Sequence, residues 1–142
     1  MAFTIKNPPE FTVEVTQWNR ETDADGVEMA KDIEKLLNND VYIKTELERQ
    51  EHTAFVTLTA DGWSGTSAPY TQTVEVSGAR EGQEPLLVSA LLDGAPPEVQ
   101  KAYTKAYGII GSGTGVLGEG TATFRVYKKP ATDITVGLRG VM

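Results

Sequence analysis

Residues 53–62, TAFVTLTADG, decide the fold class of this 142-residue chain. Over its first eight positions, residues for an inner face alternate with residues for an outer face, and Asp61-Gly62 then supplies a turn. This two-residue period is typical of a β-strand that buries one side. The stretch also marks a change in the chain, because a helical period precedes it and further strand and turn signals follow it.

The second part of the chain, residues 53–142, predicts about five strands and one inserted helix. Strands are expected at residues 53–60, 70–77, 86–92, 121–127 and 134–138. The 86–92 strand is continuously apolar, so we expect it to be buried. Pro97 and Glu98 suit the first turn of a helix that ends near Tyr107. The simplest arrangement is an antiparallel β-sandwich or a partial barrel.

The first part, residues 1–52, predicts an extended arm followed by a helical segment. Residues 11–16 alternate and indicate a short strand or an extended arm. The helical period that follows either continues as one bent helix to about Arg49 or breaks near residues 38–40 into two short helices. Thr22 is a suitable N-cap for the first of them.

An apolar stripe on this helical segment predicts self-association. Its members follow three- and four-residue spacing at first, and the stripe then loses its apolar character. A narrow apolar face on an otherwise charged helix rarely stands alone and needs a partner surface. We therefore expect an N-terminal oligomerisation interface made of Val27, Ala30, Ile33, Leu36, Leu37 and Val41.

The two parts also differ in charge. Residues 1–52 contain twelve acidic and six basic residues, whereas acids and bases are nearly balanced in residues 53–142. We therefore expect two domains with a boundary at His52-Thr53. The predicted fold class is α+β and mainly β: an N-terminal helical oligomerisation segment, followed by a β-sandwich-like antiparallel domain with one inserted helix.

The composition excludes several kinds of site. The chain has no cysteine and a single histidine, His52, which excludes disulfides, thiolate metal sites and histidine-centred metal clusters. Its net charge of −7 argues against binding to nucleic acid. No apolar run approaches the length of a membrane span, so membrane insertion is not expected. The N-terminus lacks a signal-peptide pattern, which indicates that the chain is made and kept in a cytoplasm.

Three short motifs resemble chemical sites, and each has a better structural explanation. The glycines from Gly113 to Gly118 match G-x-G-x-x-G, but a predicted helix precedes them, so a loop or hairpin is expected instead of a dinucleotide site. The stretch 62–65, GWSG, lacks the G-x-S-x-G spacing of a nucleophile elbow. The stretch 23–26, DADG, lacks the later ligands of a calcium loop, and helix capping explains Asp23 and Asp25 better. We therefore predict no enzyme, catalytic residue, metal site or cofactor.

Three aromatic residues are candidates for a recognition surface. Trp63 lies in a predicted loop among small residues, and Tyr103 and Tyr107 lie one helical turn apart on one face. Such a surface could contact a glycan or another receptor. For the two tyrosines, a core or inter-domain face is favoured by the general behaviour of aromatic residues. The alternative for Trp63 is a position in the buried core.

Several segments, in order, resemble small tail-fibre and baseplate-associated structural proteins from phages and prophages of Gram-positive bacteria. The resemblance covers roughly residues 36–141. It is carried by the segments 36–44, 63–78, 85–88, 98–107, 124–127 and 130–136. Its segments are structural, and this chain lacks the long repetitive shaft of a full fibre.

The resemblance implies a virion protein that works by assembly and binding. The implied partners are further copies of the chain in a homotrimer, other virion proteins and a host-surface glycan or receptor, and the implied location is the virion. The implied role is a short tail fibre, a baseplate accessory or a host-recognition tip. A capsid-surface head fibre or decoration protein is the first alternative, and a monomeric carbohydrate-binding β-sandwich module is the second.

Overall fold

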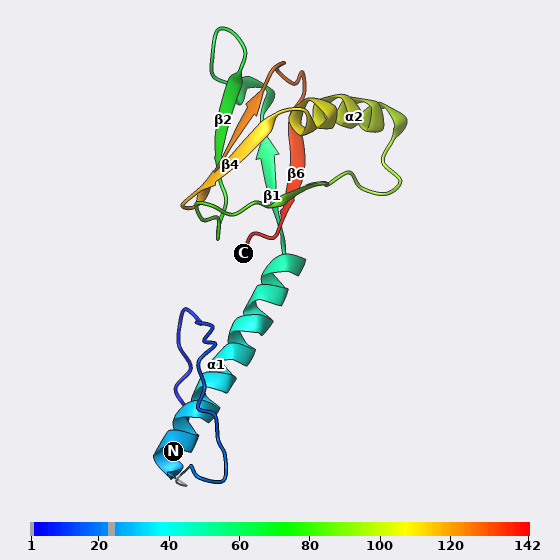
Figure 1. The fold of residues 1–142 in the computed structure, drawn as a ribbon. Coiled ribbons are helices and arrows are strands. Elements are labelled where there is room, and N and C mark those ends of the chain that lie inside the picture. Colours follow the sequence, from blue (N-terminus) through cyan, green and yellow to red (C-terminus); the bar gives the residue numbers. More distant parts are fainter. Residues whose placement is uncertain (1, 23–24) are drawn as a thin grey trace. The chain divides into compact units, whose positions relative to one another are not determined.

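The computed structural model describes residues 2–22 and 25–142, and these form two compact units. The first unit ends at Arg49 and the second begins at Gln50, close to the boundary expected from the sequence. In Figure 1 the first unit contains the blue arm and the cyan helix, and the second contains the strands and the other helix. Asp23, one of the acids assigned to helix capping, lies outside the described residues.

The first unit consists of an arm without regular secondary structure and the helix α1, Gly26–Glu51, up to Arg49; the last two helical residues belong to the second unit. The helix is continuous through residues 38–40, so the version with two short helices is wrong. Asp25 caps it, because its side chain accepts a hydrogen bond from the backbone N–H of Val27 at 2.8 Å. Thr22, the N-cap expected from the sequence, hydrogen-bonds with Asn19 instead.

The second unit is mainly β and contains two antiparallel sheets of three strands each. Its elements are β1 (Thr53–Leu58), η1 (Ala60–Gly62), β2 (Tyr70–Glu75), β3 (Leu86–Ser89), α2 (Pro97–Gly111), β4 (Thr114–Gly118), β5 (Thr121–Val126) and β6 (Ile134–Arg139). One sheet has the order β1-β6-β3 and the other the order β2-β5-β4. The C-terminal strand β6 is therefore a central strand, paired from Leu58↔Ile134 to Thr53↔Arg139 with β1.

The core of the second unit is a single apolar cluster, to which the strands contribute side chains from one face. Val56 and Leu58 of β1 alternate with exposed neighbours, as the two-residue period predicts. The central strands β5 and β6 and the helix α2 contribute most of the remaining members. The buried hydrophobic residues are Val56, Leu58, Trp63, Val76, Ala79, Ala106, Ile110, Leu117, Ala122, Phe124, Val126, Ile134, Val136, Leu138 and Val141.

Two strand predictions need correction. The stretch 86–92 is not a buried strand, because only Leu86–Ser89 pairs with β6, and it does so at a sheet edge. Leu86 is 68% exposed and Leu92 is 79% exposed. The glycine-rich stretch forms the hairpin that was one of its two expected forms, and residues 114–118 add the strand β4, paired with β5, to the five strands expected from the sequence.

The hairpin explains why glycine occupies the start of the G-x-G-x-x-G motif. A Cβ at Gly113 would lie 2.1 Å from the backbone carbonyl oxygen of Arg125, whereas the nearest atoms to a Cβ at Gly115 lie at 3.9 Å. The first glycine of the motif is therefore required by close approach of backbone to backbone. The motif has a structural origin in this chain.

Replacement of these two glycines by alanine should have unequal effects. Gly113→Ala must displace the backbone of β5 and should lower the free energy of unfolding by about 1–3 kcal/mol. Gly115→Ala meets only ordinary contacts and should change it by less than about 0.5 kcal/mol. Chemical denaturation of the two variants measures the difference. Equal destabilisation would show that the close approach at Gly113 is not the constraint.

Candidate assembly surface

The arm is attached to α1 by side chains of the helix, which bind the arm's backbone. The arm runs along the helix twice, in two passes. In the first pass, the backbone N–H of Thr4 donates to the side chain of Glu34 at 2.8 Å. The side-chain amide of Asn38 accepts from the N–H of Lys6 at 2.7 Å and donates to the carbonyl of Thr4 at 3.0 Å. An amide side chain can both donate and accept, so Asn38 binds the arm as a neighbouring strand would.

The arm then passes back along a second line of the helix. Asn39 accepts from the N–H of Thr12 and donates to its carbonyl, both at 2.8 Å. Further along, Asp32 accepts from the N–H of Thr16 at 3.2 Å and from the indole N–H of Trp18 at 2.9 Å. These contacts explain two polar residues, Asn38 and Asn39, in the middle of a helix, where their local hydrogen bonding usually disfavours them.

Asp32 is a buried carboxylate that holds the end of the arm. Burial raises its pKa, but hydrogen bonds from Thr16, Trp18 and Lys35 together lower it by more, so the pKa of Asp32 lies below its ordinary value of 3.8. A carboxyl group whose pKa is depressed in the folded state stabilises that state fully above its ordinary pKa. This contribution is lost as the pH falls through the lower folded-state value.

Removal of the Asp32 carboxylate should release the second pass of the arm. In Asp32→Ala, the N–H groups of Thr16 and Trp18 lose their acceptor, so the fluorescence of Trp18 should shift to longer wavelength at neutral pH. The parent should show the same shift only in acid, below pH 3.8. Both proteins should carry Trp63→Phe, which leaves Trp18 as the sole tryptophan.

The matched control is Glu48→Ala, which removes an exposed carboxylate from the same helix. It should leave the emission of Trp18 unchanged. If Asp32→Ala and Glu48→Ala gave the same spectrum at neutral pH, Asp32 would not anchor the arm.

The face of α1 that the arm leaves free carries a heptad repeat of large apolar side chains. Each member is between 47% and 56% exposed, and the spacing alternates between four and three residues with a single polar member, Asp40. This is the spacing of positions a and d in a coiled coil. The apolar members are Met29, Ile33, Leu36, Ile43 and Leu47. We call these five residues and Asp40 the seam.

The arm-binding side chains border this seam. Ile33 and Asp40 occupy position a of the heptad. Asp32 and Asn39 come directly before them in the sequence, so they occupy position g, on one side of the seam. On the other side, position e is occupied by Ala30, Leu37 and Lys44. Glu34 and Asn38, which bind the first pass, lie beyond position e. The arm therefore covers the polar side of α1 and leaves positions a, d and e uncovered.

The interface expected from the sequence overlaps with this free face only in part. Ile33 and Leu36 belong to the seam, and Ala30 and Leu37 lie beside it at position e. Val27 and Val41 occupy position b, towards the first pass of the arm. Met29, Ile43 and Leu47 complete the seam but are not in the expected set, because the expected stripe begins at Val27 and ends where it loses its apolar character.

Apolar side chains are distributed very differently in the two units. Among the described residues, none of the buried hydrophobic side chains belongs to residues 2–49, and the buried side chains of α1 are polar, Asp32 and Asn38. The first unit nevertheless exposes many large apolar side chains along the arm and the helix. These are Phe3, Ile5, Phe11, Val13, Val15, Trp18, Val27, Met29, Ile33, Leu36, Ile43 and Leu47. Exposed apolar surface on this scale is typical of an interaction site.

The three aromatic residues expected at a recognition surface lie inside the second unit. Trp63 is only 6% exposed and belongs to the core cluster, which excludes it from a recognition surface and agrees with the alternative of a core position. The hydroxyl of Tyr103 donates to the carbonyl of Thr135 and accepts from the N–H of Ala90, both at 2.8 Å. The ring of Tyr107 stacks on Tyr103, with a centroid distance of 5.8 Å. The two tyrosines attach α2 to its sheet, and the three residues do not form an exposed platform.

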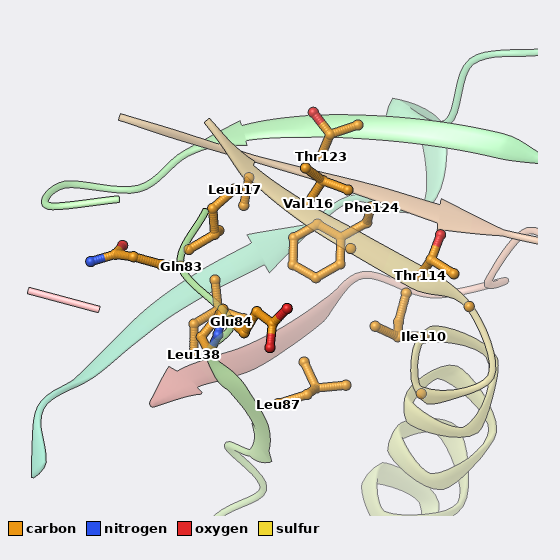
Figure 2. A pocket seen from close by; sticks show the side chains of 15 residues that line it. Gln83, Glu84, Leu87, Ile110, Thr114, Val116, Leu117, Thr123, Phe124 and Leu138 are labelled. Atoms are coloured by element: carbon orange, nitrogen blue, oxygen red, sulfur yellow. The ribbon is translucent and has the colours of Figure 1, made fainter. Parts of the chain in front are cut away.

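A cavity of about 400 Å³ opens beside β4, the end of α2 and the chain before β3. Figure 2 shows the ring of Phe124 and the side chains of Leu87 and Leu138 around it, with Glu84 close by. Glu84 is the only ionisable residue among those that line the cavity. The other side chains that line the cavity are apolar or uncharged polar, among them the hydroxyl-bearing Thr114 and Thr123.

Other tests for a chemical site give no candidate within the described part of the chain. Residues 2–22 and 25–142 contain no group of three or more His, Cys, Asp or Glu side chains that could hold a metal ion. None of their helices is long and apolar enough to cross a membrane.

No family model, curated protein or solved structure matches the chain.

Proposed function

We propose that this chain is a structural protein of a tailed-phage or prophage virion, which acts by self-association and binding. The single observation that supports self-association best is the seam on α1. Seam residues are about half exposed in the isolated chain and have the spacing at which helices pack on one another. The virion assignment rests on the resemblance of residues 36–141 to small tail-fibre and baseplate-associated proteins.

The proposed assembly is a homotrimer. A two-stranded coiled coil needs only positions a and d, whereas Ala30 and Leu37 extend the apolar face to position e. A face of three positions per heptad suits a helix that contacts two neighbours. The resemblance favours the same state.

The second unit is proposed to be the part that contacts a host surface or a virion neighbour. Its two three-stranded sheets around one core fit a sandwich-like unit, which leaves its loops free to contact a partner. A tail fibre, a baseplate accessory and a capsid-surface fibre would all use the same assembly. The monomeric carbohydrate-binding alternative has less support, because Trp63 is buried and so does not supply an exposed platform.

The virion assignment can be tested on particles. Phage or induced prophage particles from the strain that encodes the chain should be purified on a density gradient and digested for mass spectrometry. The abundance of peptides from this chain should follow the abundance of the major capsid protein across the gradient fractions. Their absence from the particle fractions, together with their presence in the cell lysate, would contradict the assignment.

A further inference from the structure

The second pass of the arm lies along the side of the seam where a neighbouring helix would pack. Thr12 is bound by Asn39 and Thr16 by Asp32, and both helix residues occupy position g. Asp32 and Asn39 are one heptad apart, so the segment between Thr12 and Thr16 follows this side of the helix for about two turns. The arm therefore becomes part of any surface that includes position g.

This arm segment presents apolar side chains that its own chain does not cover. Val13 is 83% exposed and Val15 is 48% exposed. The backbone is hydrogen-bonded to the helix on either side of the two valines, at Thr12 and at Thr16. These contacts keep the valines beside the seam. An exposed apolar strip held rigidly at the border of an unfilled seam needs a partner to cover it.

In a parallel assembly of helices, position g of one helix faces position e of the next. Position e of α1 carries Ala30, which is exposed, Leu37, which is partly exposed, and Lys44 nearer the C-terminal end of the helix. The two apolar residues are unusual at a position where charged residues normally meet across the interface. These apolar residues at position e would face the apolar strip that Val13 and Val15 form beside position g of the neighbouring helix.

We infer that the arm segment 12–16 of each chain docks on Ala30 and Leu37 of α1 in a second copy of this chain. This inference rests on the proposed self-association through the seam and specifies the arm as a second layer of the same interface. The partner is a parallel copy of this chain, since an antiparallel neighbour would pair position g with g and position e with e, so the arm at position g would not meet the apolar residues at position e.

Charge introduced on the arm tests the inference. The variant Val13→Asp with Val15→Asp should raise the dissociation constant of the assembly by about tenfold or more, because carboxylates would be buried against apolar partners. In the Trp63→Phe background, the fluorescence of Trp18 should match that of a dissociated parent, since Asp32 and Asn39 still hold the arm. The matched control, Leu92→Asp with Val99→Asp, changes exposed residues of the second unit and should assemble like the parent.

A cysteine pair gives a second, positional measurement, which is possible because the chain has no native cysteine. Chains with Val13→Cys and chains with Leu37→Cys, mixed and oxidised, should form a disulfide between the two kinds of chain. Normal assembly of the valine variant and no mixed disulfide would overturn the inference, while dissociation of the Ile33 and Leu36 variants described below would still support the seam. A monomeric parent would overturn the inference and the proposed self-association together.

Discussion

Replacement of Ile33 and Leu36 by aspartate should convert the assembly to monomers. Both residues lie in the seam, at adjacent a and d positions, and are about half exposed in the isolated chain. Each carboxylate buried without a partner costs several kcal/mol. The concentration needed for assembly should therefore rise by about a thousandfold or more. Light scattering over a range of protein concentrations measures this shift.

The change should affect assembly alone. Neither residue binds the arm, so the emission of Trp18 should keep the position it has in a dissociated parent, and the second unit should keep its thermal transition. Leu92→Asp supplies the same chemical change at a loop residue that is 79% exposed, and it should leave the mass unchanged. An Ile33 and Leu36 variant with the parent's mass at every concentration would exclude the seam as the interface.

Trp63→Ala should destabilise the second unit by about 3–5 kcal/mol, because it leaves a cavity in the core. For a unit of this size, such a loss lowers the melting temperature by more than about 10 °C. Assembly through α1 should persist below that temperature. Calorimetry on Trp63→Ala, with light scattering in parallel, measures both quantities.

Two control variants separate burial from surface recognition. Trp63→Phe keeps most of the ring and removes an indole N–H that is buried without a partner in the described structure. An unpaired buried donor costs about 1–3 kcal/mol, so Trp63→Phe should lose far less stability than Trp63→Ala. Tyr127→Ala removes an aromatic ring that is 65% exposed and should change stability by less than about 0.5 kcal/mol. Unchanged melting of Trp63→Ala would show that Trp63 is not a core residue.

The sequence predicted the strands whose inner residues are large and alternate. β1, β5 and β6 have such residues, for example Val56, Phe124 and Val136. β4 escaped prediction because Gly115 and Gly118 weaken the alternation, and glycine disfavours strands on its own. Pairing with β5, which depends on residues later in the chain, stabilises β4, and a local pattern does not report it.

The helix was predicted, but its free face was only partly identified. Periodicity alone does not reveal which side of α1 is covered, because the arm binds through hydrogen bonds from Asp32, Asn38 and Asn39. Such polar contacts leave no apolar repeat in the sequence. The pair Asn38-Asn39 was the available signal. It suggested a helix break, whereas these residues bind the arm.

Solution mass of the unmodified full-length chain tests the central claim most directly. Sedimentation or light scattering at micromolar concentration and neutral pH should give three times the chain mass of 15.4 kDa. The mass should fall towards that of one chain only on strong dilution. A single species of 15.4 kDa throughout the micromolar range would contradict self-association through α1.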